Sequence, residues 1–120
     1  MSWTIRYFLT REGVLPAREF RASLPAKLRS KLDLFVQETA RSRGSIGGGI
    51  FQACHGGYGD LFKVRAKLGR ELARYFCGID GEMLILLDGI HKRLGEATPD
   101  EALDRAAGHL AEYRRTRRAV

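Results

Sequence analysis

The strongest pattern in the chain lies in residues 60–93, where apolar and polar positions alternate along successive segments. In the first segment, from about Leu61 to Leu68, apolar side chains alternate with Lys63, Arg65 and Lys67. In a strand, successive side chains point to opposite faces of the sheet. This alternation therefore predicts a strand with one buried face. We expect an antiparallel sheet built on residues 60–93 to organise the domain.

Two short turns separate the predicted strands. Gly69-Arg70 permits a tight turn, and Asp80-Gly81 is among the strongest hairpin signals that a sequence can carry. The second strand is therefore predicted from about Glu71 to Ile79, and the third from Met83 to Leu87. The third strand is apolar on both faces, which predicts a central position covered on both sides.

Two-residue turns also define a register. They pair Leu68 with Glu71, Val64 with Tyr75, Arg65 with Arg74, Ile79 with Glu82, and Tyr75 with Leu86. One face then carries the predicted core, namely Phe62, Val64, Ala73, Tyr75, Cys77, Leu84 and Leu86. On the other face, the positively charged Arg65 and Arg74 lie directly opposite each other, and like charges in this arrangement destabilise a sheet. This arrangement favours either an anion between the two guanidinium groups or a separate carboxylate or water partner for each.

The flanking segments predict one further strand and three helices. An opening strand follows from the alternation of Trp3, Ile5, Tyr7 and Leu9. Pro16 and Pro25 each mark the first turn of a helix, and Gly44 ends the second helix. Thr98 and Glu101 form a capping box, with Pro99 at the first position of a last helix. The order β-α-α-β-β-β-α predicts one small α+β domain over residues 1–120, with a mostly antiparallel sheet.

The charge balance concerns partners rather than fold. Lys and Arg number 21 against 14 Asp and Glu, which gives a net charge of +7. Such a balance favours nucleic acid, an anionic surface or an acidic protein as a partner. No apolar run approaches the length that spans a membrane, and Arg6 interrupts the alternating amino-terminal residues, so neither a membrane segment nor a signal peptide is predicted. Cys54 and Cys77 lack a CxxC spacing and are expected to be reduced thiols of a cytoplasmic protein.

Two segments stand apart by composition. Residues 44–59 contain seven glycines but lack the Gly-Lys-Ser/Thr end of a P-loop and open no evident helix. We expect a flexible connection there, with Ile50 to Ala53 as a short edge segment. The basic tail, residues 114–120, either extends a nucleic-acid footprint or is a solvated end. No His-x-x-x-His, paired carboxylates or Cys/His cluster occurs at ligand spacing, so no metal site and no cofactor are expected.

Four short motifs in order resemble the RelE/ParE toxin superfamily, most closely its HigB-like, phage-derived branch. Residues 60–65, DLFKVR, are similar to the family's "glyElR" strand, and 74–76, RYF, to its "R-x-x-Y-F" strand. Residues 86–93, LLDGIHKR, are similar to "llhgFxKK", and residues 98–113 to the family's closing helix. This chain departs from the family at Asp88 and Ile90, where His and an aromatic residue are usual.

The resemblance implies a RelE-like fold and the toxin of a type II toxin-antitoxin system. Such a toxin is typically a ribosome-dependent messenger-RNA endonuclease that inhibits translation. A cognate helix-turn-helix antitoxin holds it inactive and supports oligomerisation. The alternative is a ParE-like inhibitor of a DNA topoisomerase (gyrase) that cleaves nothing. A third interpretation is a degenerate relative that retains only antitoxin or nucleic-acid binding.

Cleavage of RNA without a metal uses the 2′-OH as nucleophile, so a site must remove its proton, stabilise the phosphorane and protonate the leaving oxygen. Guanidinium forks suit phosphate oxygens, and a histidine at a strand end suits proton transfer. The predicted catalytic residues are Arg65, Arg74, His91 and Lys92. The predicted RNA-binding residues are Lys63, Lys67, Arg93, Arg114 and Arg115, with His55 and Tyr113 ranked lower. The simpler interpretation is a solvated sheet face for Arg65 and Arg74 and an ordinary surface residue for His91.

Overall fold

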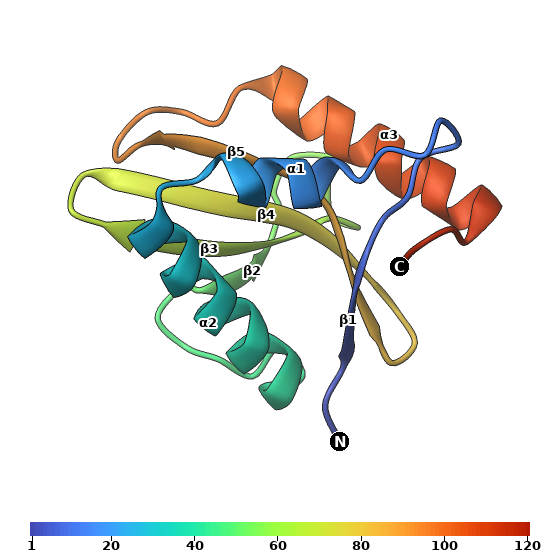
Figure 1. The fold of residues 1–120 in the computed structure, drawn as a ribbon, viewed down its shortest axis with the longest axis horizontal. Helices are drawn as coiled ribbons and strands as arrows, with labels where there is room; N and C mark the ends of the chain where they lie inside the picture. The colour runs from blue at the N-terminus through green and yellow to red at the C-terminus, as the bar shows by residue number, and fades with distance from the viewer.

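Five strands form one sheet in the order β1-β5-β4-β3-β2 in a computed structural model that describes residues 1–120 (Figure 1). The strands are β1 (Thr4–Tyr7), β2 (Phe51–Ala53), β3 (Phe62–Leu68), β4 (Glu71–Asp80) and β5 (Met83–Arg93). The helices are α1 (Pro16–Ser23), α2 (Ala26–Ser42) and α3 (Asp100–Thr116). Only β1 and β5 run parallel, which confirms an α+β fold with a mostly antiparallel sheet.

The helices cover both faces of the sheet (Figure 1). Helices α1 and α2 pack on one face, where Val64, Tyr75 and Leu86 belong to the first core cluster. Helix α3 packs on the other face, through a second cluster that contains Phe76 and Ile85. Strand β5 is fully buried from Leu84 to Gly89, as its double-sided apolar pattern predicted. The predicted core face is therefore confirmed.

The register of the first hairpin is as predicted, whereas that of the second is not. Arg65 pairs with Arg74 across β3 and β4. In the second hairpin, Asp80 pairs with Met83, so the two-residue loop is Gly81-Glu82 rather than Asp80-Gly81. The turn pattern located the hairpin correctly, but it placed the loop one residue too early.

A β-bulge in the second hairpin changes the faces of β5. Phe76 pairs with Asp88, whereas the next residue of β4, Cys77, pairs with Leu86, so β5 has one extra residue at this point. An extra residue reverses which side chains face which side of a sheet. Beyond the bulge, Gly89 meets the Phe20 ring of α1, and Ile90 packs against the α3 cluster.

The segments around the sheet both confirm and correct the sequence-based expectations. The expected edge segment is present as β2, antiparallel to β3. The predicted capping box is wrong, since Pro99 is the residue before α3 and no side chain caps that helix. The carboxyl end is not a free solvated tail, because Tyr7 and Val120 exchange backbone hydrogen bonds of 2.7 and 2.9 Å. No helix in the protein combines the length and apolar character needed to cross a membrane.

Substitution of Gly89 tests the packing of α1 on the bulged strand. A Cβ at this position would lie 2.2 Å from the Phe20 ring, so Gly89→Ala is expected to lower the free energy of unfolding by about 1–3 kcal/mol. Gly108→Ala is the matched control, because Gly108 lies in α3 and a Cβ there would meet nothing within 4 Å. That change is expected to be neutral or to stabilise by up to about 1 kcal/mol. Urea denaturation measures both, and equal effects would contradict the close packing.

Candidate functional site

Four cationic side chains lie close together on the α3 face of the sheet. They are Lys63 and Arg65 of β3, Arg74 of β4 and Lys92 of β5, and we refer to them as the basic cluster. None of them forms a salt bridge. The Glu96 carboxylate acts on Lys92, but the four cations outnumber it, so the cluster is suited to an anion.

Arg74 is the buried centre of the basic cluster. It is 8% exposed, and Nη1 donates a hydrogen bond of 2.5 Å to the Thr98 hydroxyl. Its buried Nε has no hydrogen-bond partner. Burial lowers the pKa of Arg74, and the nearby positive charge of Arg65 lowers it further. A buried guanidinium without a carboxylate is unfavourable for folding, so its surroundings favour an incoming anion.

The two lysines of the basic cluster differ in their contacts. Burial lowers the pKa of both Lys63 and Lys92, and the charge of Arg74 adds to each shift. Lys92 donates a hydrogen bond from Nζ to the backbone carbonyl of Glu96. Lys63 lies among the other three cations without such a contact, and it is the more buried of the two. Lys63 is therefore the lysine better placed to contact a ligand and to release a proton to it.

The Gly-rich segment forms one wall of the basic cluster. Arg65 donates a hydrogen bond of 2.9 Å from Nε to the carbonyl of Gly49. A Cβ on Gly49 would lie 2.9 Å from Arg65 Nη2, and its φ of +70° favours glycine, so no other residue fits well there. Cys54, within this segment, is buried, and burial raises the pKa of its thiol. The segment thus positions a charged side chain, a role that glycine content alone did not indicate.

His91 does not belong to the basic cluster, contrary to the sequence-based prediction. The bulge turns this side chain to the α1 and α2 face, where Nε2 lies 3.6 Å from Oε2 of Glu71. Without the extra residue in β5, the side chain would share a face with Arg74. The same reversal brings Lys92 toward Arg74, and it leaves the cluster without an imidazole.

Other predicted site residues lie at a distance from Arg74. Helix α3 begins beside Thr98 and rises about 20 Å to its last turn, which carries Tyr113, Arg114 and Arg115. There the Tyr113 hydroxyl donates to Asp80 at 2.7 Å, and Arg114 contacts Asp60 at 3.1 Å. These residues do not form one site with the basic cluster. Lys67 is exposed on β3, and His55 is exposed in the Gly-rich segment. Arg93 is also exposed, but it pairs with Glu71 beyond the bulge and so lies on the face of His91.

The remaining histidine, His109, has a structural role. Its Nε2 lies 3.4 Å from Asp88, which also accepts a hydrogen bond of 2.6 Å from Arg105. These contacts join α3 to β5 at the bulge.

Sequence reasoning missed Thr98 as a partner of the basic cluster, because its pattern with Glu101 indicated a helix cap instead.

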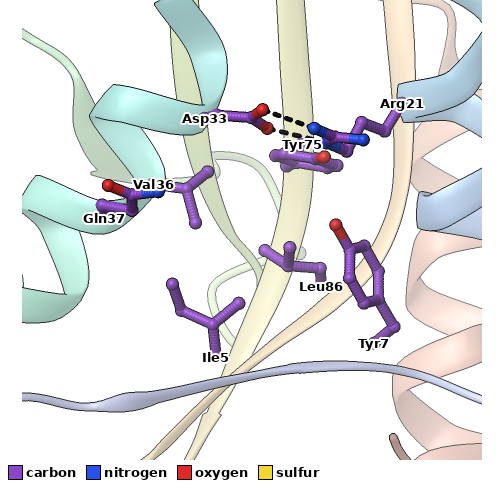
Figure 2. A pocket seen from close by; sticks show the side chains of 8 residues that line it. All are labelled: Ile5, Tyr7, Arg21, Asp33, Val36, Gln37, Tyr75 and Leu86. Atoms are coloured by element: carbon purple, nitrogen blue, oxygen red, sulfur yellow. Dashed lines mark hydrogen bonds and ion pairs between the residues drawn. The ribbon is translucent and has the colours of Figure 1, made fainter. Parts of the chain in front are cut away.

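A separate pocket of about 230 Å³ lies on the opposite face, between the sheet and the α1–α2 hairpin (Figure 2). Figure 2 shows Arg21 and Asp33 joined across its rim by hydrogen bonds of 2.8 and 2.6 Å. The buried hydroxyl of Tyr75 lies at this pocket without a partner, and burial raises its pKa. Tyr75 and Arg74 are consecutive in β4, so their side chains point to opposite faces of the sheet. The sheet therefore separates this pocket from the basic cluster.

The site contains no group of three or more His, Cys, Asp or Glu side chains that could hold a metal ion. The chain matches no protein-family model, and no curated protein matches it.

Inorganic phosphate tests the basic cluster as an anion site. At ten times its dissociation constant, phosphate is expected to raise the free energy of unfolding by about 1.4 kcal/mol, because it binds the folded protein alone. Arg74→Met should abolish this gain while being neutral or slightly stabilising without phosphate, because it removes an unbalanced buried charge. Thermal denaturation over a phosphate series measures both effects.

Phosphate also stabilises proteins without binding a site, so a charge-matched control is needed. Arg18 is exposed on α1, away from the basic cluster, and Arg18→Met removes the same charge. This variant should retain the full phosphate effect. The same response in the wild-type protein and both variants would show that the basic cluster is not an anion site.

Proposed function

We propose that the protein is a metal-independent endoribonuclease that cleaves messenger RNA at the ribosome, as the toxin of a type II toxin-antitoxin system. The observation that carries the proposal is Arg74, a buried guanidinium with an unpartnered Nε and three further cations around it. Evolution tolerates such a destabilising group chiefly where function requires it. The order of motifs that resembles the HigB-like toxins supports the same function.

In the proposed reaction, the 2′-OH of one nucleotide attacks the adjacent phosphorus. Arg65 and Arg74 lie on paired positions and would hold the non-bridging oxygens, whose negative charge increases in the phosphorane. Lys63 would donate a proton to the leaving 5′ oxygen, since its lowered pKa makes it a stronger acid than an ordinary lysine. The products are a 2′,3′-cyclic phosphate and a 5′-hydroxyl.

The 2′-OH proton passes to solvent water as the new O–P bond forms, because His91 lies on the other face and the proposal assigns no histidine as the base. Most of the acceleration then comes from charge stabilisation and from alignment of the nucleophile, both of which are large effects in other enzymes. The ribosome would contribute to alignment by holding the messenger RNA. A cognate antitoxin of the helix-turn-helix class would inhibit the protein, as the resemblance implies.

The alternative function, inhibition of a topoisomerase without cleavage, is favoured by the same position of His91. A binding protein needs no proton-transfer group, and the basic cluster lacks an imidazole. The two functions differ in what happens to RNA. The nuclease leaves new transcript ends, whereas the topoisomerase inhibitor leaves intact transcripts and damaged DNA.

Induced expression in bacteria, with transcript 5′ ends mapped minutes later, tests the nuclease. New ends are expected within translated reading frames, together with growth arrest. Arg65→Ala and Arg74→Ala should each remove both effects, because each deletes a contact with the phosphorane, whereas Arg18→Ala on α1 should retain them. Circular dichroism confirms that the variants fold.

The result that contradicts the proposal is growth arrest with intact transcripts and an induced DNA-damage response. That outcome would establish the topoisomerase inhibitor. No arrest by the folded wild-type protein would identify a degenerate relative.

The role of Lys63 can be tested by the pH dependence of cleavage. An acid acts only while protonated, so the rate should fall as pH rises through the pKa of Lys63, which lies below the ordinary 10.5. Lys63→Arg keeps the charge but cannot release the proton, so the rate should drop by about 100-fold and this fall should disappear. Single-turnover cleavage of ribosome-bound messenger RNA provides the measurement. A variant that retains the wild-type pH profile would place the acid elsewhere.

A further inference from the structure

A second cationic pocket, of about 210 Å³, adjoins the basic cluster at the edge of the sheet. Its lining comes from α2, the Gly-rich segment and β3, and consists of Lys31, Phe35, Gly48, Ile50, Arg65 and Lys67. Arg65 belongs both to this pocket and to the basic cluster. We refer to this pocket of six residues as the edge pocket.

The edge pocket exists because β2 covers only part of β3. The last strand pair is Phe51 with Val64, and the next contact is a hydrogen bond of 3.0 Å from the Arg65 amide to the Ile50 carbonyl. Beyond it, the carbonyl of Lys67 accepts a hydrogen bond of 2.7 Å from Nζ of Lys31 instead of pairing with a strand. The open edge is thus bordered by α2 and carries side chains from three elements.

The edge pocket is positively charged without compensation. Lys31, Arg65 and Lys67 form no salt bridge. The two carboxylates of α2 do not help, because Asp33 is paired with Arg21 and Glu38 with Arg41. An anionic group that enters this pocket therefore meets three cations and no competing acid.

The edge pocket also has an apolar side, which a site for a bare anion does not need. Phe35 and Ile50 are both half-buried and line it, and Lys31 Nζ lies 5.9 Å from the centre of the Phe35 ring. Gly48 leaves the entrance without a side chain. Sites for single-stranded nucleic acid combine cations for the phosphates with aromatic or apolar side chains for the bases.

We propose that the edge pocket binds one unpaired nucleotide of the RNA strand, next to the phosphate held at Arg74. The base would contact Phe35 and Ile50, its phosphate would lie among Lys31, Arg65 and Lys67, and Arg65 would link the two positions. A base that enters such a pocket cannot be paired, so the substrate class is single-stranded RNA of at least two nucleotides. This inference rests on the proposed function and specifies its substrate.

Fluorescence anisotropy with a labelled 2′-O-methyl hexanucleotide, which has no free 2′-OH and is not cleaved, tests the cationic part. Lys31→Ala should weaken binding about twofold to fivefold. It should also reduce the slope of log K against log salt by about 0.7, the value for one lost contact with a single strand. Lys27→Ala is the control, since Lys27 is exposed one turn earlier on α2 and lies outside the edge pocket.

The apolar part is tested with Phe35→Leu, which keeps an apolar side chain but removes the ring. This variant should weaken hexanucleotide binding about tenfold, because base stacking is lost. Binding of tripolyphosphate, a polyanion without bases, should not change. Circular dichroism checks the fold, and Lys31→Ala keeps the inference testable if the Phe35 variant is unstable.

Two results would overturn the inference. One is an equal effect of Lys31→Ala and Lys27→Ala on affinity and salt slope. The other is an equal loss of hexanucleotide and tripolyphosphate binding in Phe35→Leu. Arg74→Ala separates these failures from failure of the proposed function: if it abolishes hexanucleotide binding while Lys31→Ala matches its control, the basic cluster binds RNA and the edge pocket does not. If Arg74→Ala also binds like the wild type, both proposals fail.

Discussion

The single extra residue in β5 determines which side chains share a site in this protein. A strand alternates between its two faces, so one inserted residue exchanges the faces for every position beyond it. Here the exchange brings Lys92 toward Arg74 and carries His91 to the far side of the sheet. It also places Gly89 beneath Phe20, which lets α1 pack closely on the strand. The bulge is held from the α3 side, where Arg105 and His109 contact Asp88.

The fold followed from sequence periodicity more completely than the site did. Alternation in residues 60–79 gave the β3–β4 register, including the pairing of Arg65 with Arg74, because Gly69-Arg70 leaves little choice of turn. The β4–β5 register did not follow, since Asp80-Gly81 and Gly81-Glu82 are both plausible loops. A bulge at the end of a continuous apolar run such as residues 83–87 has no signature in hydrophobicity, because residues on both faces are buried. The position of His91 depended on that bulge and was therefore predicted on the wrong face.

Burial without charge compensation connects the stability of the domain with its proposed activity. Arg74 and Lys63 are held in surroundings that lower the pKa of each, which means that the folded protein disfavours their charged forms. An anion that binds there relieves this unfavourable energy, so part of its binding free energy comes from the protein itself. Thr98 and Gly49 maintain the arrangement by accepting hydrogen bonds from Arg74 and Arg65. Neither residue type signals a cation site by itself, which explains why sequence reasoning missed them.

The backbone contacts at β1 have a consequence for solubility. A strand at the edge of a sheet exposes unpaired backbone groups that can recruit a strand from another molecule, which leads to aggregation. On the outer side of β1, Trp3 donates to the carbonyl of Ala40, and residues 118–120 bond to Tyr7 and Leu9. At the opposite edge, β2 has only three residues. The chain thus leaves no long, flat edge on which a second copy could extend the sheet, which protects a sheet with a strongly apolar centre from edge-to-edge association.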